Sequence, residues 1–134
     1  MHPRLFAAFA KASAFAGLAA LVAACQSSTP VKGPDRSALS TMERVALGAN
    51  GCWFKSGDPA FAAYKLAPEL NSFSGRPRIL VVHKGSPESR PLLVVQAEGN
   101  PSKLDAFGPM MQGATGPRIV KDVTRWASGG KACG

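Results

Sequence analysis

Three cysteines, at positions 25, 52 and 133, are the residues of this sequence whose chemistry is easiest to anticipate. Their spacing lacks the Cys-X-X-Cys pattern of thiol redox sites. A zinc ion is held by three or four protein ligands, and beyond residue 25 the chain offers His83 alone beside the thiols. The sequence therefore predicts no metal ion and no other cofactor.

His83 is also the residue through which a Ser-His-Asp or Cys-His mechanism would have to run. It follows an apolar stretch, and no GxSxG motif accompanies it. The acidic residues are scattered along the chain, and the phosphate-binding patterns GxxxxGK[ST] and GxGxxG are absent. We therefore expect a protein that is not an enzyme.

Basic residues form the other pattern with chemical meaning. The chain has 16 Lys and Arg against 8 Asp and Glu, a formal net charge of +8. Arg118, Lys121 and Arg125 recur at helical spacing, which predicts a stripe on one helix face that could bind anionic lipid headgroups or the phosphates of a glycan. An ordinary solvated helix face is the alternative. Trp53, Trp126 and Phe107 likewise suit either a binding groove or a core.

The N-terminal residues indicate the cellular compartment in which the protein is expected. Residues 1–24 contain Arg4 and Lys11, no acidic residue, and an apolar run over 12–24. This is typical of a secretory signal peptide. The run is shorter than the ~20 residues that a transmembrane helix needs, so cleavage is expected and a permanent span is not.

The end of the apolar run, Leu21-Val22-Ala23-Ala24-Cys25, resembles the lipobox of bacterial lipoproteins. The resemblance implies that the Cys25 thiol takes a diacylglycerol and that Cys25 becomes the first residue of the mature chain, with two or three acyl chains such as palmitate. Several chains together give stable membrane anchoring. Gln26, in place of Asp, implies transfer to the periplasmic face of the outer membrane, with the plasma membrane as the alternative.

Composition then divides the chain into a tether and a domain. Residues 25–36 contain Ser, Pro and Gly and almost nothing apolar after Cys25, as linkers do. Residues 37–134 form one stretch without repeats, long enough for a single small domain. We therefore expect a signal peptide over 1–24, a lipid-anchored linker over 25–36 and one globular domain over 37–134.

Helix signals begin and end this domain. Ser40 and Glu43 have capping-box spacing, and the apolar residues that follow recur at helical period until Asn50 and Gly51 predict a stop. At the other end, Pro117 predicts a helix start, with apolar residues on one face until Gly129 and Gly130.

Strand signals lie between the two helices. The runs 78–83 and 91–97 are rich in Val, Leu and Ile, and the loop between them suits an antiparallel hairpin. Their continuous apolar character predicts burial on both faces. A weaker strand is expected over 61–66, and 100–111 is left as a turn with a short piece of undefined type. The fold class is thus α+β, a small antiparallel sheet of three or four strands with an N-terminal and a C-terminal helix.

With Cys25 acylated, two cysteines remain in an oxidising compartment. Cys52 follows the first predicted helix and Cys133 follows the last. We therefore predict a Cys52–Cys133 disulfide that ties the two ends of the domain together.

Together these features predict a lipid-anchored cell-envelope protein that is not catalytic and binds another envelope component, either a protein or an anionic glycan or lipid. Nucleic acid is not expected as a partner of a secreted protein, despite the positive charge. The alternative is an inhibitor of a periplasmic or host hydrolase such as lysozyme or a protease. The chain resembles such inhibitors only in its size and its expected location in the cell envelope.

Overall fold

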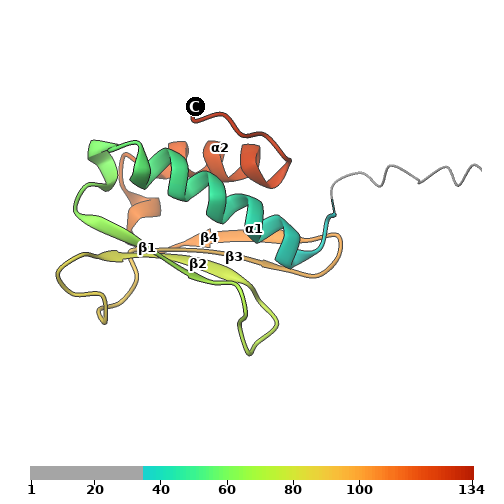
Figure 1. Cartoon of the computed structure of the whole chain (residues 1–134). Helices are drawn as coiled ribbons and strands as arrows, with labels where there is room; N and C mark the ends of the chain where they lie inside the picture. The colour runs from blue at the N-terminus through green and yellow to red at the C-terminus, as the bar shows by residue number, and fades with distance from the viewer. Residues whose placement is uncertain (1–34) are drawn as a thin grey trace, which may run out of the picture. The chain divides into compact units, whose positions relative to one another are not determined.

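Two helices lie on one face of a four-stranded antiparallel sheet (Figure 1). The computed structural model describes residues 35–134, so the predicted signal peptide, the lipobox at Cys25 and most of the linker lie outside it. The sheet order is β1-β2-β3-β4. The elements are α1 (Ala38–Ala49), a π-helix (Asn50–Lys55), a 3-10 helix (Pro59–Phe61), β1 (Tyr64–Glu69), β2 (Arg78–His83), β3 (Leu93–Glu98), β4 (Lys103–Phe107), a second 3-10 helix (Pro109–Gln112) and α2 (Gly116–Ala127). The α+β prediction with a helix at each end is confirmed.

Helix α1 begins earlier than predicted, and the chain stays helical beyond its end. Ser37 is its N-cap, because the Ser40 backbone N–H donates to Ser37 Oγ at 3.3 Å, so the capping box predicted from Ser40 is wrong. The α-helix stops where predicted, with Ala49 as its last residue and Asn50 as its C-cap, but the chain then continues as a π-helix to Lys55, which was not predicted. Continuation buries Trp53 completely, and this apolar burial outweighs the ~1 kcal/mol helix cost of glycine.

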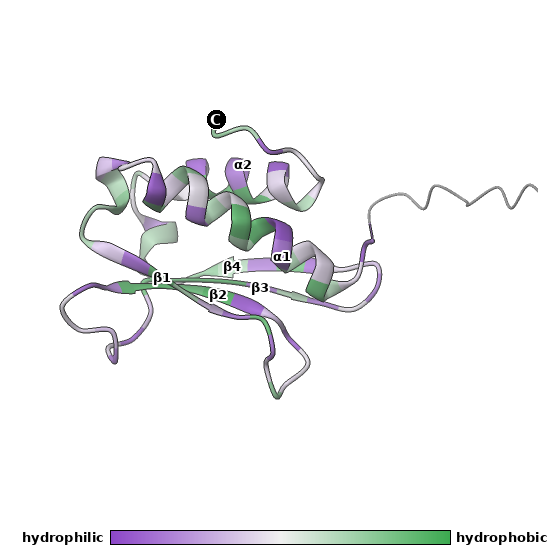
Figure 2. Cartoon of the chain, viewed as in Figure 1, coloured by the Kyte–Doolittle hydropathy of each residue, from purple (hydrophilic) through white to green (hydrophobic). Residues whose placement is uncertain are grey.

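The central hairpin forms as predicted. β2 and β3 pair antiparallel, with Leu80 opposite Val94. The last predicted helix is also confirmed as α2, with Pro117 in its first turn. In Figure 2, hydrophobic residues lie along β2 and on the side of α1 near the sheet, as a two-layer core requires.

The two edge strands were harder to predict. Phe61 belongs to a 3-10 helix, whose Asp58 N-cap accepts a hydrogen bond from the Ala60 N–H at 3.0 Å, so the strand predicted over 61–66 starts only at Tyr64. The undefined segment 100–111 contains β4 and all but the last residue of the second 3-10 helix. β4 alternates polar and apolar residues and is largely exposed, which explains why no continuous apolar run marked it.

Two tryptophans form the centre of the core. Trp53 stacks on Phe61 with ring centroids 4.6 Å apart and meets Trp126 edge-on at 5.1 Å. Helix α1 approaches Trp126 through Gly48, where a Cβ atom would lie 2.2 Å from the indole ring. The two helices can therefore pack this closely only because residue 48 has no side chain.

The predicted disulfide joins Cys52 to Cys133, which are 81 positions apart in sequence and have Cα atoms 5.2 Å apart. The chain after α2 turns back toward the π-helix to make this bond. Trp126 Nε1 holds the same segment by donating to the Ala132 carbonyl at 3.1 Å. The bond therefore fastens the C-terminal residues across the end of α1.

The face of the sheet away from the helices carries a row of apolar residues, one from each strand. The strand register places them opposite one another: Ala67, Leu80, Val94 and Phe107. Val82 and Val94 on this face are 3% and 9% exposed, so burial of the hairpin on both faces is confirmed for them. Phe107 is 45% exposed. Met110 joins the core formed with the helices instead of covering this row.

Candidate functional site

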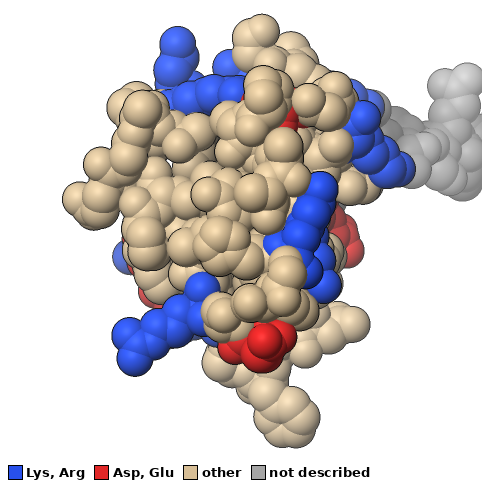
Figure 3. All heavy atoms as spheres, turned by 90° about the vertical axis from the view of Figure 1, so that its left-hand side faces the viewer, with Lys and Arg blue, Asp and Glu red and all other residues tan. Residues whose placement is uncertain are grey.

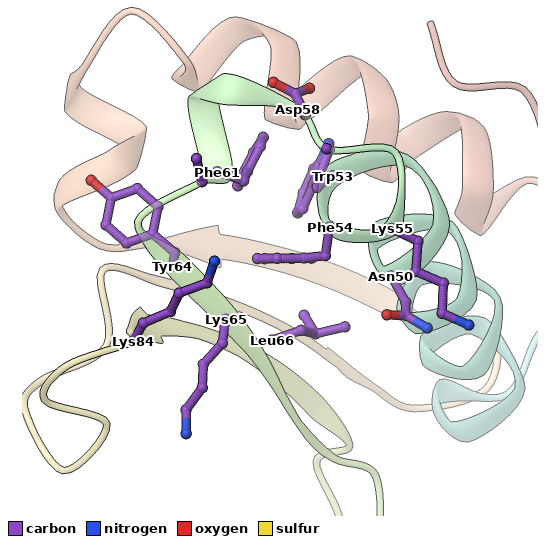
Figure 4. Close-up of a pocket in the computed structure, with 12 residues that line it drawn as sticks. Asn50, Trp53, Phe54, Lys55, Asp58, Phe61, Tyr64, Lys65, Leu66 and Lys84 are labelled. Carbon is purple, nitrogen blue, oxygen red and sulfur yellow. The ribbon is translucent and has the colours of Figure 1, made fainter.

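A hollow of about 500 Å³ lies at the end of the domain where α1 passes into the π-helix (Figure 4). The π-helix, the first 3-10 helix, the start of β1 and the residue after β2 each contribute to it. Its lining residues are Asn50, Trp53, Phe54, Lys55, Gly57, Asp58, Phe61, Ala62, Tyr64, Lys65, Leu66 and Lys84. Its volume suits a small ligand or one or two sugar units of a longer chain.

Aromatic rings form the wall of the hollow. Phe54 and Tyr64 are half-buried, whereas Trp53 and Phe61 are buried behind them. Phe54 meets Phe61 edge-on with centroids 5.7 Å apart, and Phe61 is stacked on Trp53. These packed contacts fix the rings of Phe54, Phe61 and Trp53, so this part of the wall is formed before any ligand binds.

Lysine side chains stand on two sides of these rings. In Figure 4, Lys84 extends from the strand end toward the space between Tyr64 and Phe54, and Lys55 lies on the opposite side next to Asn50. Lys65 points away from the rings. Lys84 is placed by its backbone N–H, which donates to the Ala63 carbonyl at 3.1 Å and so extends the β1–β2 pairing.

The acid at the rim of the hollow is already neutralised. Asp58 accepts a hydrogen bond from the Arg118 guanidinium, which also lies over the Phe61 ring at 5.8 Å. This hydrogen bond holds the pKa of Asp58 below its ordinary value of 3.8, and the same bond raises the pKa of Arg118. The pair stays ionised at neutral pH, so Asp58 adds no uncompensated negative charge to the hollow.

Basic residues also surround the hollow on the surface of the domain. Figure 3 looks onto this end of the domain and shows Lys and Arg side chains at several places around a largely uncharged middle, with few acidic atoms in view. Because a hollow with low-dielectric walls concentrates the field of nearby charges, an anion is attracted toward the rings.

The predicted basic stripe on α2 divides into two kinds of residue. Asp122 on the same helix is 1% exposed, and it pairs with Arg125 at 2.8 Å and with Arg118 at 3.4 Å. Lys121 is exposed. Both arginines therefore bind carboxylates of the protein itself, and a ligand-binding role for Arg118, Lys121 and Arg125 together stays a prediction.

Two of the three aromatic residues singled out in the sequence, Trp53 and Trp126, pack against each other, and Phe107 lies apart from them. Trp53 and Trp126 are fully buried, which confirms the core alternative for both. Phe107 lies on the far face of the sheet. Of the three, only Trp53 lines the hollow, behind Phe61. No motif marked Phe54, Tyr64 and Lys84, because they come from segments that only the fold brings together.

His83 ends β2 on the surface, with its ring centroid 5.1 Å from that of Tyr64. Within residues 35–134, no three His, Cys, Asp or Glu side chains gather in the way that a metal ion requires. Across the same residues, no helix has the length and apolarity needed to cross a bilayer. The hollow thus offers rings and ammonium groups, which suit the binding of a ring with an anionic substituent.

Comparison of the chain with protein-family models, with curated proteins and with solved structures finds no match.

Proposed function

We propose that this chain is a lipid-anchored cell-envelope protein, not an enzyme, whose domain binds an anionic envelope glycan in the aromatic hollow. The anchor is the lipid that the sequence Leu21–Cys25 implies on Cys25. Gln26 favours the outer membrane, facing the periplasm, over the plasma membrane. The Cys52–Cys133 disulfide supports export, because such bonds persist in oxidising compartments.

The observation that carries the binding proposal is the position of Lys84 in front of fixed aromatic rings (Figure 4). The C–H faces of a sugar ring pack against aromatic side chains, and a phosphate or carboxylate on that sugar attracts an ammonium group. The ion pair of Asp58 with Arg118 removes the one nearby charge that would oppose this. A glycan is favoured over a lipid because the wall is open at the surface and polar at its rim.

The experiment is a titration of the full-length lipidated protein, held in neutral-lipid vesicles, with the phosphorylated oligosaccharide of a lipopolysaccharide. Trp53 reports binding by its fluorescence, because it stacks on Phe61 directly behind the hollow. We expect Lys84→Gln to weaken binding about tenfold, equivalent to ~1.4 kcal/mol. We expect a smaller loss for Lys55→Gln.

Lys103→Gln is the matched control, since it removes the same charge from an exposed position on β4, outside both the hollow and the α2 stripe. The dephosphorylated oligosaccharide controls for the anionic group. Equal affinity of the Lys84→Gln and Lys103→Gln variants would contradict the proposal for the hollow. A tight complex with lysozyme or a protease, unaffected by Lys84→Gln, would instead favour the inhibitor alternative.

A further inference from the structure

The end of the domain opposite the hollow gathers three segments. The Ala38 N–H donates to the Gly99 carbonyl at 3.0 Å, which places the start of α1 against the β3–β4 turn. Arg76 pairs with Glu98 at 2.9 Å, which places the β1–β2 loop beside the same turn. In Figure 1 this loop and the beginning of α1 lie at one end of the sheet. The described chain therefore enters the domain where the β1–β2 loop projects.

The tip of that loop holds an aromatic side chain in the solvent. Phe73 has a relative exposure of 112%, the highest of the large hydrophobic residues in the described part of the chain. The loop around it has a defined turn, because the Gly75 N–H donates to the Ser72 carbonyl at 3.1 Å and the Ser72 and Ser74 hydroxyls are 2.7 Å apart. A small polar turn that displays one phenyl ring can place that ring in the interface between lipid headgroups and acyl chains.

We propose that this end of the domain rests on the bilayer that holds the lipid on Cys25, with Phe73 inserted among the headgroups and the aromatic hollow facing away from the membrane. The inference rests on the lipid anchor of the proposed function. It adds an interaction surface, the β1–β2 loop around Phe73, and an orientation of the binding site.

The length of chain before the domain favours the anchoring bilayer as the occupant. The residues from Cys25 to Ala38 can span at most about 47 Å, because a residue extends by no more than ~3.6 Å. The entry point at Ala38 is thus confined near the membrane, and Phe73 projects from the same end. α1 is 12 residues long, so it separates this end from the hollow by about 18 Å at ~1.5 Å per residue.

The charges at this end decide what kind of contact is made. Arg76 pairs with Glu98 and Arg78 pairs with Glu69, so the flanks of the loop carry compensated charge. A single inserted phenyl ring gives little affinity by itself, but a tethered domain is held at high local concentration and needs little. The contact should therefore form on neutral lipid and persist in high salt, unlike glycan binding in the hollow, which salt weakens.

The test uses the full-length protein from its membrane, reconstituted in phosphatidylcholine vesicles that contain brominated lipid. In Phe73→Trp, the added indole should be quenched at least about twofold more strongly than that in Leu47→Trp. Leu47 is the matched control, because it is 74% exposed near the other end of α1. The native Trp53 and Trp126 are fully buried and contribute equally to both variants.

Equal quenching of the two variants, on protein whose Cys25 is shown by mass spectrometry to be acylated, would overturn the inference and leave the proposed anchor intact. Absence of the acyl chains would overturn the anchor and the inference with it. A third outcome is a blue-shifted emission of the Phe73→Trp variant that brominated lipid does not quench and whose blue shift disappears when the protein is diluted. This would show that a second copy of the chain covers Phe73, and it would also overturn the inference.

Discussion

The indole nitrogen of Trp53 donates a 2.9 Å hydrogen bond to Oδ2 of Asp122 in the core between the two helices. This bond joins the π-helix to α2. Because Asp122 also holds Arg118 and Arg125, one buried carboxylate fixes the back of the hollow and most of the predicted basic stripe. The positive face of α2 thus has a structural use that the spacing of its residues did not reveal.

Asp122→Ala should lower the free energy of unfolding by about 3–5 kcal/mol, because it leaves a buried indole N–H unpaired and removes the partner of two arginines. Urea denaturation followed by tryptophan fluorescence measures this loss. Asp105→Ala on β4 is the control, an exposed acid that we expect to change stability by no more than ~0.5 kcal/mol. Similar midpoints for both variants would refute the structural role of Asp122.

Gly48→Ala should destabilise the protein although alanine is the better helix former. The new Cβ would meet the Trp126 ring at 2.2 Å, and such overpacking costs about 1–3 kcal/mol, against a helix-propensity gain of ~1 kcal/mol. Gly51→Ala is the matched control, since nothing lies within 4 Å of its Cβ position. Thermal melts should show a lower Tm for Gly48→Ala alone; a Tm at or above that of the wild type would contradict the close approach of the helices.

Loss of the disulfide should destabilise the domain strongly. The bond closes a loop of 81 positions, for which chain entropy gives about 4.5 kcal/mol. We expect the Cys52→Ser, Cys133→Ser double variant to have a markedly lower urea midpoint than the wild type. The wild type under reducing conditions should match the double variant, and a midpoint that reduction leaves unchanged would count against the bond.

Acid should weaken the contact between Asp58 and Arg118. Because the pKa of Asp58 is lowered in the folded state, the stability from this pair is fully present above its ordinary pKa of 3.8 and is lost as the pH falls through the lowered value. The guanidinium is 39% exposed and solvent-screened, so the contribution is about 1 kcal/mol or less.

Asp58→Asn tests this dependence, because asparagine can still cap the 3-10 helix while it removes the charge. Unfolding in urea, measured from pH 7 to pH 2, should show a difference between wild type and variant above the ordinary Asp pKa that closes in stronger acid. A difference that stays constant over this range would contradict an ionised pair.

The parts of the fold that were predictable from sequence are those with a continuous signal. β2 and β3 have apolar runs bounded by Gly and Pro, and α2 has an apolar face between Pro117 and paired glycines. By contrast, β4 is an exposed edge strand without such a run. The extension of α1 past Gly51 depends on the burial of Trp53 against Trp126, a contact 73 positions away in sequence that no local pattern encodes.

The candidate site was less predictable than the fold. Phe54, Tyr64 and Lys84 belong to different elements, and Lys84 reaches the hollow only because β1 and β2 pair in the observed register. The spacing of Arg118 and Arg125 did indicate a shared helix face, but it contained no information on Asp58, which becomes the partner of Arg118 through tertiary packing. Sequence spacing reports neighbours along a helix, whereas the partners here come from elsewhere in the chain.

Attachment of the protein to a membrane through Cys25 is the claim on which the proposed function and the orientation of the domain depend. Its most direct test is mass spectrometry of the N-terminal peptide of protein isolated from the membranes of its own host. We predict a peptide that starts at Cys25 and carries two or three acyl chains. A peptide that starts at Met1, or a bare Cys25 on protein recovered from the soluble fraction, would contradict the account.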